Sequence, residues 1–135
     1  MPGETNLQKL LGSMSPELLP GIFVFATLPP GTSRPAGVNP MMTFREREGD
    51  TLILPEGEAR AAGFPFAFPS RMITLNIHSS LDAVGFLAAI TARLAAAGMG
   101  VNPVSGYFHD HLFVPADRVE EAMTILRALA AENGA

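Results

Sequence analysis

Cysteine is absent from this chain, and charged residues are scarce. Charged residues make up 16% of the 135 positions, and nine basic against thirteen acidic side chains give a formal net charge of −4. The absence of cysteine excludes a disulfide framework, a thiol nucleophile and a thiolate metal site, and it is typical of the reducing cytoplasm in which we expect the protein to work. The basic residues are spread singly along the chain. They form no basic patch for phosphate contacts, so we expect no nucleic-acid partner.

Long hydrophobic runs are also missing. The longest run of small and apolar residues, 83–92, is ten residues long, about half of the ~20 that a membrane-spanning helix needs. The first six residues are neither basic nor apolar, so we expect no membrane span and no signal peptide. Hydrophobic residues nevertheless make up 47% of the chain, which excludes disorder. A surface so poor in charge favours coverage by another subunit, and we expect a homo-oligomer such as a dimer.

Apolar periodicity and turn residues predict the order of elements in the first half. We expect a short amphipathic helix from Leu7 to about Gly12, followed by a single helical turn that begins at Ser15. Further along, the patterns predict a buried strand over 22–28, a proline-rich loop over 29–40, a hairpin with strands over 43–48 and 51–54, a helix over 56–62 and an extended edge segment over 64–69.

The second half has clearer patterns. Strict alternation over 72–78 predicts a strand with one core face and one polar face. A helix is expected over 83–97, and its apolar residues on several sides predict burial on more than one side. The remaining elements are a hairpin with strands over 101–108 and 111–114 and an amphipathic helix from about Asp117 to Gly134.

An internal repeat relates the two hairpins. The sequences DTLILP at 50–55 and DHLFVP at 110–115 share a pattern sixty residues apart, and a helix follows each copy. Both copies read as versions of a split β-α-β fold, with the loop at 29–40 in place of the first helix of the first copy. The sequence therefore predicts an α+β, ferredoxin-like protein of two repeats, 1–70 and 71–135, with antiparallel sheets backed by helices. The second copy lacks its final strand, which we expect the first half to supply, with 22–28 as the candidate.

The segment between the strand and the helix of the second copy, LDAVGFL at 81–87, resembles the ACT domain, a small-ligand regulatory module of amino-acid metabolism. Longer stretches, FRE at 44–46, ITL at 73–75, HSSLDAVG at 78–85 and GYFHDHLFVP at 106–115, resemble a bacterial family of stand-alone tandem ACT-like proteins. The architecture is also similar to the cytosolic arginine sensor of animals, in which paired ACT domains hold an amino acid between them. The resemblance implies a βαββαβ fold for each repeat and a non-catalytic regulatory protein that binds an amino acid and needs no cofactor.

The same junction also has a physical reason to bind an amino acid. Ser79, Ser80 and Asp82 precede a helix whose first-turn N–H groups are unpaired and suit a carboxylate. Asp82 can accept hydrogen bonds from an ammonium group, and Gly85 allows a ligand to approach closely. The alternative is that Ser80 or Asp82 only caps the helix and Gly85 relieves crowding. The predicted ligand-binding residues, at this junction and at the hairpin that follows, are Asn76, His78, Ser79, Ser80, Asp82, Val84, Gly85, Gly106, Tyr107, His109 and His111.

Two histidines in the second hairpin raise the question of a metal. His109 and His111 would lie on one side of a strand, as two zinc ligands do, and Asp110 lies between them. Asp110, however, aligns with Asp50 in the other hairpin, which has no histidines, and this favours a turn-forming role for Asp110. We therefore expect no metal, and histidines that line a pocket or an interface. The alternative is a surface hairpin without a ligand.

Catalytic patterns are lacking as well. The sequence has no nucleophile elbow, phosphate loop or dinucleotide fingerprint, so we expect no enzyme. The alternative to a ligand-binding module is an interaction protein that oligomerises through the small-residue helix over 83–97 and an open sheet face. Only the ligand-binding hypothesis predicts that a small molecule stabilises the protein.

Overall fold

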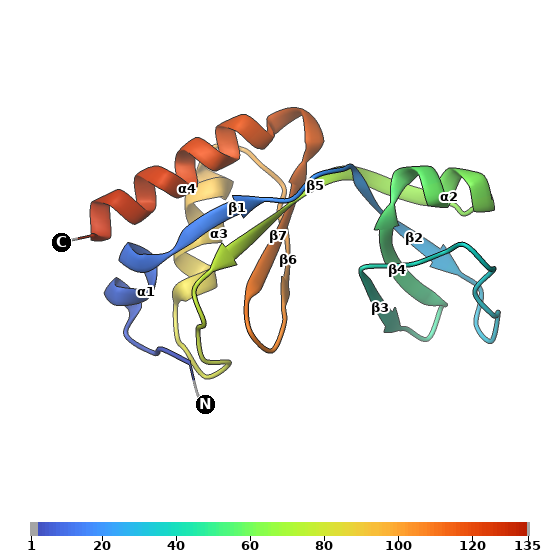
Figure 1. The fold of residues 1–135 in the computed structure, drawn as a ribbon, viewed down its shortest axis with the longest axis horizontal. Helices are drawn as coiled ribbons and strands as arrows, with labels where there is room; N and C mark the ends of the chain where they lie inside the picture. The colour runs from blue at the N-terminus through green and yellow to red at the C-terminus, as the bar shows by residue number, and fades with distance from the viewer. Residues whose placement is uncertain (1–2, 135) are drawn as a thin grey trace. The chain divides into compact units, whose positions relative to one another are not determined.

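One long strand, β5 (Phe66–Asn76), contributes to two separate compact units of the chain. The computed structural model describes residues 3–134 (Figure 1); residues 1, 2 and 135, at the outer ends of the two predicted repeats, lie outside that range. The first unit comprises the residues up to Pro20 and those from Arg71 onward, and the second comprises Gly21–Ser70. The division of the sequence into repeats 1–70 and 71–135 stays a prediction, whereas in space the N-terminal segment packs with the C-terminal half.

The second unit is an antiparallel sheet with a helix on one face. Its strands are β2 (Phe23–Leu28), β3 (Met42–Arg45), β4 (Asp50–Pro55) and the first half of β5, in the order β3-β4-β2-β5. No helix or strand lies between β2 and β3, so a loop stands where a ferredoxin-like unit has its first helix. Helix α2 (Glu56–Ala62) ends at Gly63 as predicted. The buried cluster of this unit consists of Val24, Ala26, Leu28, Leu52, Leu54 and Ala59.

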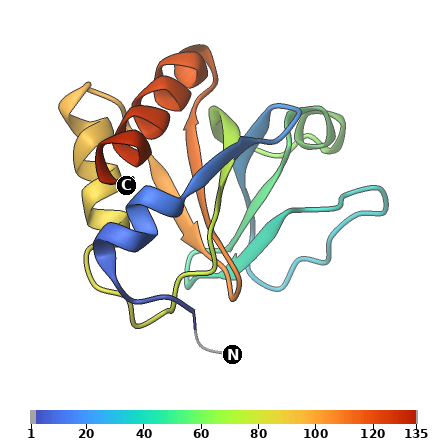
Figure 2. The ribbon, with the colours of Figure 1, turned by 60° about the vertical axis from the view of Figure 1, so that its left-hand side comes forward.

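The first unit has more helices. In chain order its elements are α1 (Leu7–Ser13), β1 (Ser15–Leu18), the second half of β5, α3 (Phe86–Ala96), β6 (Asn102–Ser105), β7 (Asp110–Pro115), the 3-10 turn η1 (Ala116–Arg118) and α4 (Val119–Asn133). The strand order is β1-β5-β7-β6, which is that of a ferredoxin-like sheet whose final strand comes from the N-terminal side. Helices α3 and α4 lie next to each other (Figure 2).

The strand that completes this sheet is not the predicted one. Residues 22–28 were the candidate, but they form β2 and pair with β4 inside the second unit. The missing strand is β1, whose Ser15 pairs with Asn76 and whose Leu18 pairs with Ile73. The expected helical turn at Ser15 is therefore wrong. Pro16 is compatible with β1 because this strand lies at the edge of the sheet, where a missing N–H costs no ladder hydrogen bond.

Three predicted boundaries also move. Helix α3 begins at Phe86, not at residue 83, because Gly85 adopts a left-handed conformation with φ of 91°. Strand β6 ends at Ser105, and β3 ends at Arg45, because turns follow both. The polar face predicted for 72–78 is wrong as well. Thr74 is buried on that face, together with Met72.

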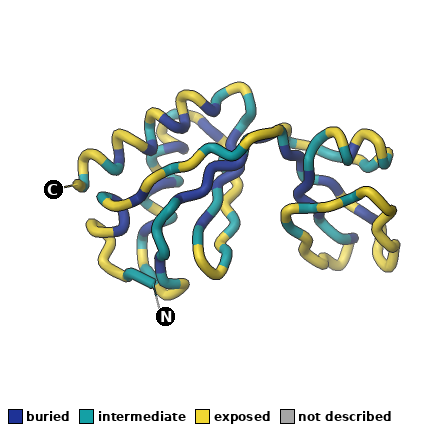
Figure 3. Tube along the Cα trace, viewed as in Figure 1, coloured by how far each residue is buried: buried dark blue, intermediate teal, exposed yellow. Residues whose placement is uncertain are grey.

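The core of the first unit consists of buried residues from both its helices and its strands. The apolar stripe of the predicted amphipathic helix is buried in α4 and consists of Val119, Ala122, Met123, Leu126 and Leu129. Buried and exposed positions alternate along this helix in Figure 3. Leu10, Ile73, Ile90, Leu112 and Leu126 are fully buried and come from five elements. Each such side chain contributes about 1.5–3 kcal/mol by leaving water. Within residues 3–134, no helix combines the length and the hydropathy that crossing a membrane requires.

Candidate functional site

The loop between β5 and α3 meets the start of β7 at a buried carboxylate. Asp110, the first residue of β7, is 7% exposed. The hydroxyl of Ser79 donates to its Oδ2 atom at 3.1 Å, and the hydroxyl of Ser105 donates to its Oδ1 atom at 2.6 Å. An ionised carboxylate offers about four acceptor positions. Two therefore remain on Asp110 for a further donor.

The N-terminus of α3 lies beside the same carboxylate. Gly85 is the N-cap residue and provides no side-chain cap, and the first intrahelical bond runs from the Ala89 N–H to the Gly85 carbonyl. The N–H groups of the first turn therefore have no acceptor within the helix, and the helix dipole adds a partial positive charge there. A hollow of about 210 Å³ is lined by Ser79, Ser80, Leu81, Ala83, Gly85, Phe86, Leu87, Ala88, Ser105 and Asp110.

This hollow is complementary to a zwitterion. Free backbone N–H groups suit a carboxylate, and the Asp110 carboxylate suits an ammonium group, since charge-assisted hydrogen bonds are the stronger ones. Asp110 is the one acidic or basic residue among those that line the hollow. The remaining walls are apolar or carry hydroxyl groups, so the space beside the two charges favours an uncharged group.

A second hollow, of about 200 Å³, is also lined by residues of the loop between β5 and α3. It is lined by Gly3, His78, Ser79, Ser80, Leu81, Asp82 and Tyr107. Asp82 is exposed, its N–H bonds to the Ser80 hydroxyl at 3.0 Å, and it lines this hollow and not the one at Asp110. The aromatic rings of His78 and Tyr107 lie 5.7 Å and 4.9 Å from that of Phe108.

The structure thus gathers part of the predicted set at one loop. Ser79 and Ser80 line both hollows, Gly85 lines the first, and His78, Asp82 and Tyr107 line the second. The other five predicted residues line neither hollow: Asn76, Val84, Gly106, His109 and His111.

Those five residues have other surroundings. The Asn76 amide donates to Glu17 at 2.8 Å, and Val84 is 84% exposed. The Gly106 N–H donates to the His109 carbonyl and closes the hairpin turn. Whether any of them contacts a ligand stays a prediction.

Both histidines of the second hairpin are half-buried, and His111 is the one whose ring contacts Thr74. Its Nδ1 atom lies 3.0 Å from the Thr74 hydroxyl, and its ring lies 6.4 Å from that of His109. Burial lowers the pKa of His111, the charge of His109 lowers it further, and Asp110 opposes both. Among residues 3–134, no three acidic or histidine side chains converge as metal ligands would.

Two polar residues of the hollow were missed by the sequence analysis, Ser105 and Asp110. Asp110 was assigned a turn-forming role because it aligns with Asp50, but the structure places it in β7 with its side chain held by two serines. The partner Ser79 is thirty-one residues away in the sequence. No local signal identified Asp110, because Asp50 also lies directly before the apolar run of a strand and is only half-buried.

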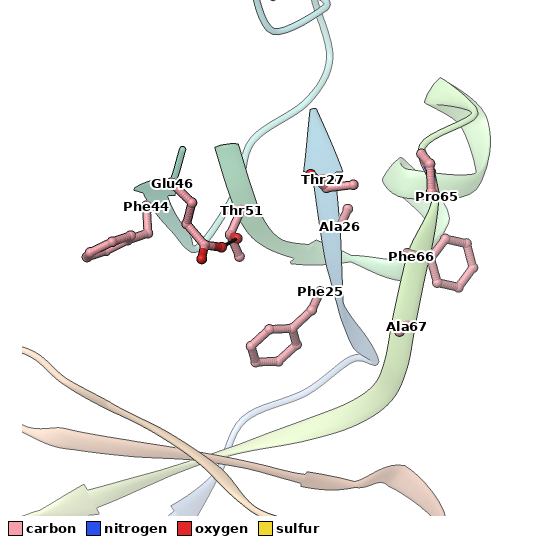
Figure 4. A pocket seen from close by; sticks show the side chains of 9 residues that line it. All are labelled: Phe25, Ala26, Thr27, Phe44, Glu46, Thr51, Pro65, Phe66 and Ala67. Atoms are coloured by element: carbon pink, nitrogen blue, oxygen red, sulfur yellow. Dashed lines mark hydrogen bonds between the residues drawn. The ribbon is translucent and has the colours of Figure 1, made fainter. Parts of the chain in front are cut away.

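The second unit has a wider hollow, of about 650 Å³ (Figure 4). Phe25, Phe44 and Thr51 line it from three strands, and the hydroxyl of Thr51 donates to the Glu46 carboxylate. Figure 4 shows these last two side chains turned toward each other. No helix residue and none of the predicted ligand-binding residues lines this hollow. It therefore lacks the pairing of a helix N-terminus with a buried acid.

Comparison with known proteins gives consistent matches. Two family models match the chain, both described as ACT domain, over residues 2–71 and 67–128. No curated protein matches it. A crystal structure from Vibrio cholerae, described as a protein of unknown function and possible transport protein, is 41% identical, with a TM-score of 0.83 over 92% of this chain and 95% of that one.

More distant structures share the fold. A protein from Agrobacterium tumefaciens is 18% identical, with a TM-score of 0.74 over 87% of this chain and 89% of that one. The regulatory subunit of aspartate kinase from Thermus thermophilus is 11% identical, with a TM-score of 0.58 over 84% of this chain and 95% of that one. These findings confirm the resemblance and the α+β, ferredoxin-like class. The chain belongs to the ACT-domain family and carries two ACT repeats in tandem.

Proposed function

We propose that the first unit binds a small α-amino acid in the hollow between the N-terminus of α3 and Asp110, and that the protein acts as a non-catalytic sensor in the cytoplasm. ACT domains are regulatory and typically bind amino acids. The observation that carries the proposal is the buried Asp110 carboxylate, which lines the same hollow as the first turn of α3. The ligand carboxylate bonds to the N–H groups, and its ammonium group bonds to Asp110.

The size and the walls of the hollow narrow the class of amino acid. A volume of about 210 Å³ corresponds to roughly seven water molecules at ~30 Å³ each. The side-chain end meets apolar walls such as Leu87 and Phe86 and no second ionised group. A charged ligand side chain would be desolvated without a partner, which is costly. We therefore expect a small uncharged amino acid to bind more tightly than aspartate, glutamate, lysine or arginine.

The test starts with a thermal-shift screen of the protein against the twenty amino acids. A ligand at ~100 times its Kd adds about 2.7 kcal/mol of stability. The best ligand is then titrated calorimetrically against Asp110→Asn, which keeps the size of the side chain and removes its charge, and against Asp117→Asn, an exposed position in η1. We expect Asp110→Asn to weaken binding by about 1.5–3 kcal/mol and Asp117→Asn to leave it unchanged. Equal affinity in both variants would remove Asp110 from the site.

A second function is favoured by a different observation. Four large apolar residues near the loop are well exposed: Leu81 at 70%, Val84 at 84%, Tyr107 at 67% and Phe108 at 62%. Apolar groups gathered on a surface are typical of protein interfaces, which supports the oligomerisation module as the alternative. Light scattering across a range of protein concentrations tests it. An oligomer that is lost in Val84→Asp and is indifferent to every amino acid would favour this alternative over the sensor.

A further inference from the structure

The segment before α1 crosses the binding loop and is joined to it by backbone hydrogen bonds. The Glu4 N–H donates to the His78 carbonyl at 2.9 Å, and the Glu4 carbonyl accepts from the Ser80 N–H at 3.0 Å. Glu4 and Ser79 thereby form an isolated parallel bridge. The two bonds hold the backbone on both sides of Ser79, the residue whose hydroxyl donates to Asp110.

Gly3 shows how close this approach is. A Cβ atom added to Gly3 would lie 2.5 Å from the His78 carbonyl oxygen and 2.6 Å from the Ser80 nitrogen. Both neighbours are backbone atoms, so no side-chain rotation relieves the contact. Any other residue at this position must move either the segment or the loop away.

The other end of the segment contacts the start of α3. The side chain of Leu7, the first residue of α1, lies 3.4 Å from the position that a Cβ atom on Gly85 would occupy. Leu7 therefore contacts the N-cap residue of the helix whose first turn lines the hollow. The segment and Leu7 thus contact the loop at both of its ends.

The segment is stiffened by its own side chains. The Glu4 carboxylate accepts from the N–H groups of Thr5 and Asn6, both at 3.0 Å, and the Asn6 side chain caps α1 through the Lys9 N–H at 2.9 Å. The two N–H bonds hold the pKa of Glu4 below its usual value. Helix α1 itself is anchored in the core by Leu10 and Leu11. The position of the loop is therefore tied to a rigid element.

We infer that residues 3–7 form a positioning strap for the amino-acid site, which sets the place of Ser79 and, through it, the direction of the Asp110 carboxylate. This rests on the proposed function. The strap residues touch the loop and not the zwitterion-binding groups themselves. Their loss loosens the loop and lowers the affinity for the amino acid, while the core of the first unit stays folded because Leu10 and Leu11 keep their places.

The test uses Gly3→Ala in the full chain, with Gly100→Ala as the matched control, because a Cβ atom on Gly100 meets nothing within 4 Å. Two quantities are measured in each variant: hydrogen exchange of the Glu4 and Ser80 amides, and the Kd of the amino acid that shifts the wild-type protein most. In Gly3→Ala we expect the Glu4 and Ser80 amides to exchange faster than in the wild-type protein. We expect the Kd to rise by about tenfold, or about 1.4 kcal/mol. The melting temperature should fall by less than about 4 °C, and Gly100→Ala should match the wild-type protein.

The outcomes separate this inference from the proposed function. If the wild-type protein binds and Gly3→Ala binds equally well although its two amides exchange faster, the strap has no positioning role and the proposed site stands. If no amino acid raises the melting temperature of the wild-type protein, the proposed function is contradicted, and with it the role of the strap at that site. Leu7→Ala gives a second route, because it removes the contact at Gly85 and leaves the backbone bridge. A weaker Kd with the Glu4 and Ser80 amides still protected supports the strap at its other end, whereas an unchanged Kd contradicts the role of Leu7.

Discussion

The two units have the same order of strands, but they differ in the segment that follows the first strand of each repeat, which is β5 in the first unit and β2 in the second. In the first unit β5 is followed by a short loop and by α3, and the first residues of that helix line a hollow. In the second unit β2 is followed by a proline-rich loop without a helix. Asp110 and Asp50 occupy matching places in the repeat, yet Asp110 is buried under two serine hydroxyls, and no hydrogen bond of that kind is seen at Asp50, which is half-buried. A helix N-terminus and a buried acid occur together at the proposed site of the first unit, and this pairing is not seen in the hollow of the second unit.

The largest expected effect concerns the core of the first unit. Leu126→Ala in α4 removes a fully buried side chain from the cluster of the first unit, and we expect a loss of about 2–5 kcal/mol in the free energy of unfolding. Urea denaturation measures it. Leu81→Ala is the control, because Leu81 is 70% exposed, and it should change stability by less than about 0.5 kcal/mol. A loss below that limit in Leu126→Ala would contradict the placement of this helix.

The two aspartates provide the next test. Asp110→Ala leaves the hydroxyls of Ser79 and Ser105 without their acceptor, and we expect it to destabilise the protein by about 1–3 kcal/mol. Asp50→Ala at the matching place should cost less, because no such pair of hydroxyls faces it. Urea denaturation of both variants decides the comparison. Equal losses of stability in the two variants would show that Asp50 and Asp110 stabilise their hairpins equally.

A smaller effect is expected at two glycines with similar backbone angles. Gly85 has φ of 91° and Gly37, in the proline-rich loop, has φ of 86°. Alanine at either position pays the strain of the left-handed region, about 1–2 kcal/mol. Of the two, only Gly85 lines the proposed site, so only Gly85→Ala should also weaken binding of the amino acid, as calorimetry would show. Unchanged affinity in Gly85→Ala would separate this glycine from the site.

The smallest effect is a pH dependence confined to the first unit. The pKa of His111 is lowered from the ordinary value of 6.5, mainly by burial, so the unfolded chain binds a proton there more readily than the folded one. The corresponding stability is present above pH 6.5 and is lost as the pH falls toward the folded pKa. Thr51 occupies the matching place in the second unit and does not titrate. We expect His111→Gln to flatten the decline in melting temperature between pH 7 and pH 5, and an unchanged slope would assign the decline to other groups.

Local signals in the sequence predicted much of the fold. Helix 56–62 has the bounds that were predicted, because Gly63 ends it with a left-handed residue that needs no partner from elsewhere. The stripe of α4 is likewise a property of its own sequence. The order of the repeated elements, and the loop at 29–40 in place of a first helix, followed from the spacing of the repeated strands and hairpins.

Features that depend on distant partners were not predicted. Strand β1 has four residues and a proline, and only its pairing with β5 makes it a strand. The role of Asp110 depends on Ser79, which no local pattern connects to it. Helix α3 begins at Phe86 and not at the predicted residue 83, because Gly85 adopts a left-handed backbone conformation. The apolar pattern around Gly85 gives no sign of that conformation.

The path of the chain through the two units has a consequence for biosynthesis. The chain leaves the first unit after Pro20, builds the whole of the second unit, and returns at Arg71, so one unit is inserted within the other. A nascent chain therefore completes residues 21–70 while the proposed amino-acid site still lacks its loop, its helix and Asp110. Since units of a chain tend to fold in the order of synthesis, we expect the second unit to fold first, and the proposed amino-acid site to form only after Asp110 has been synthesised.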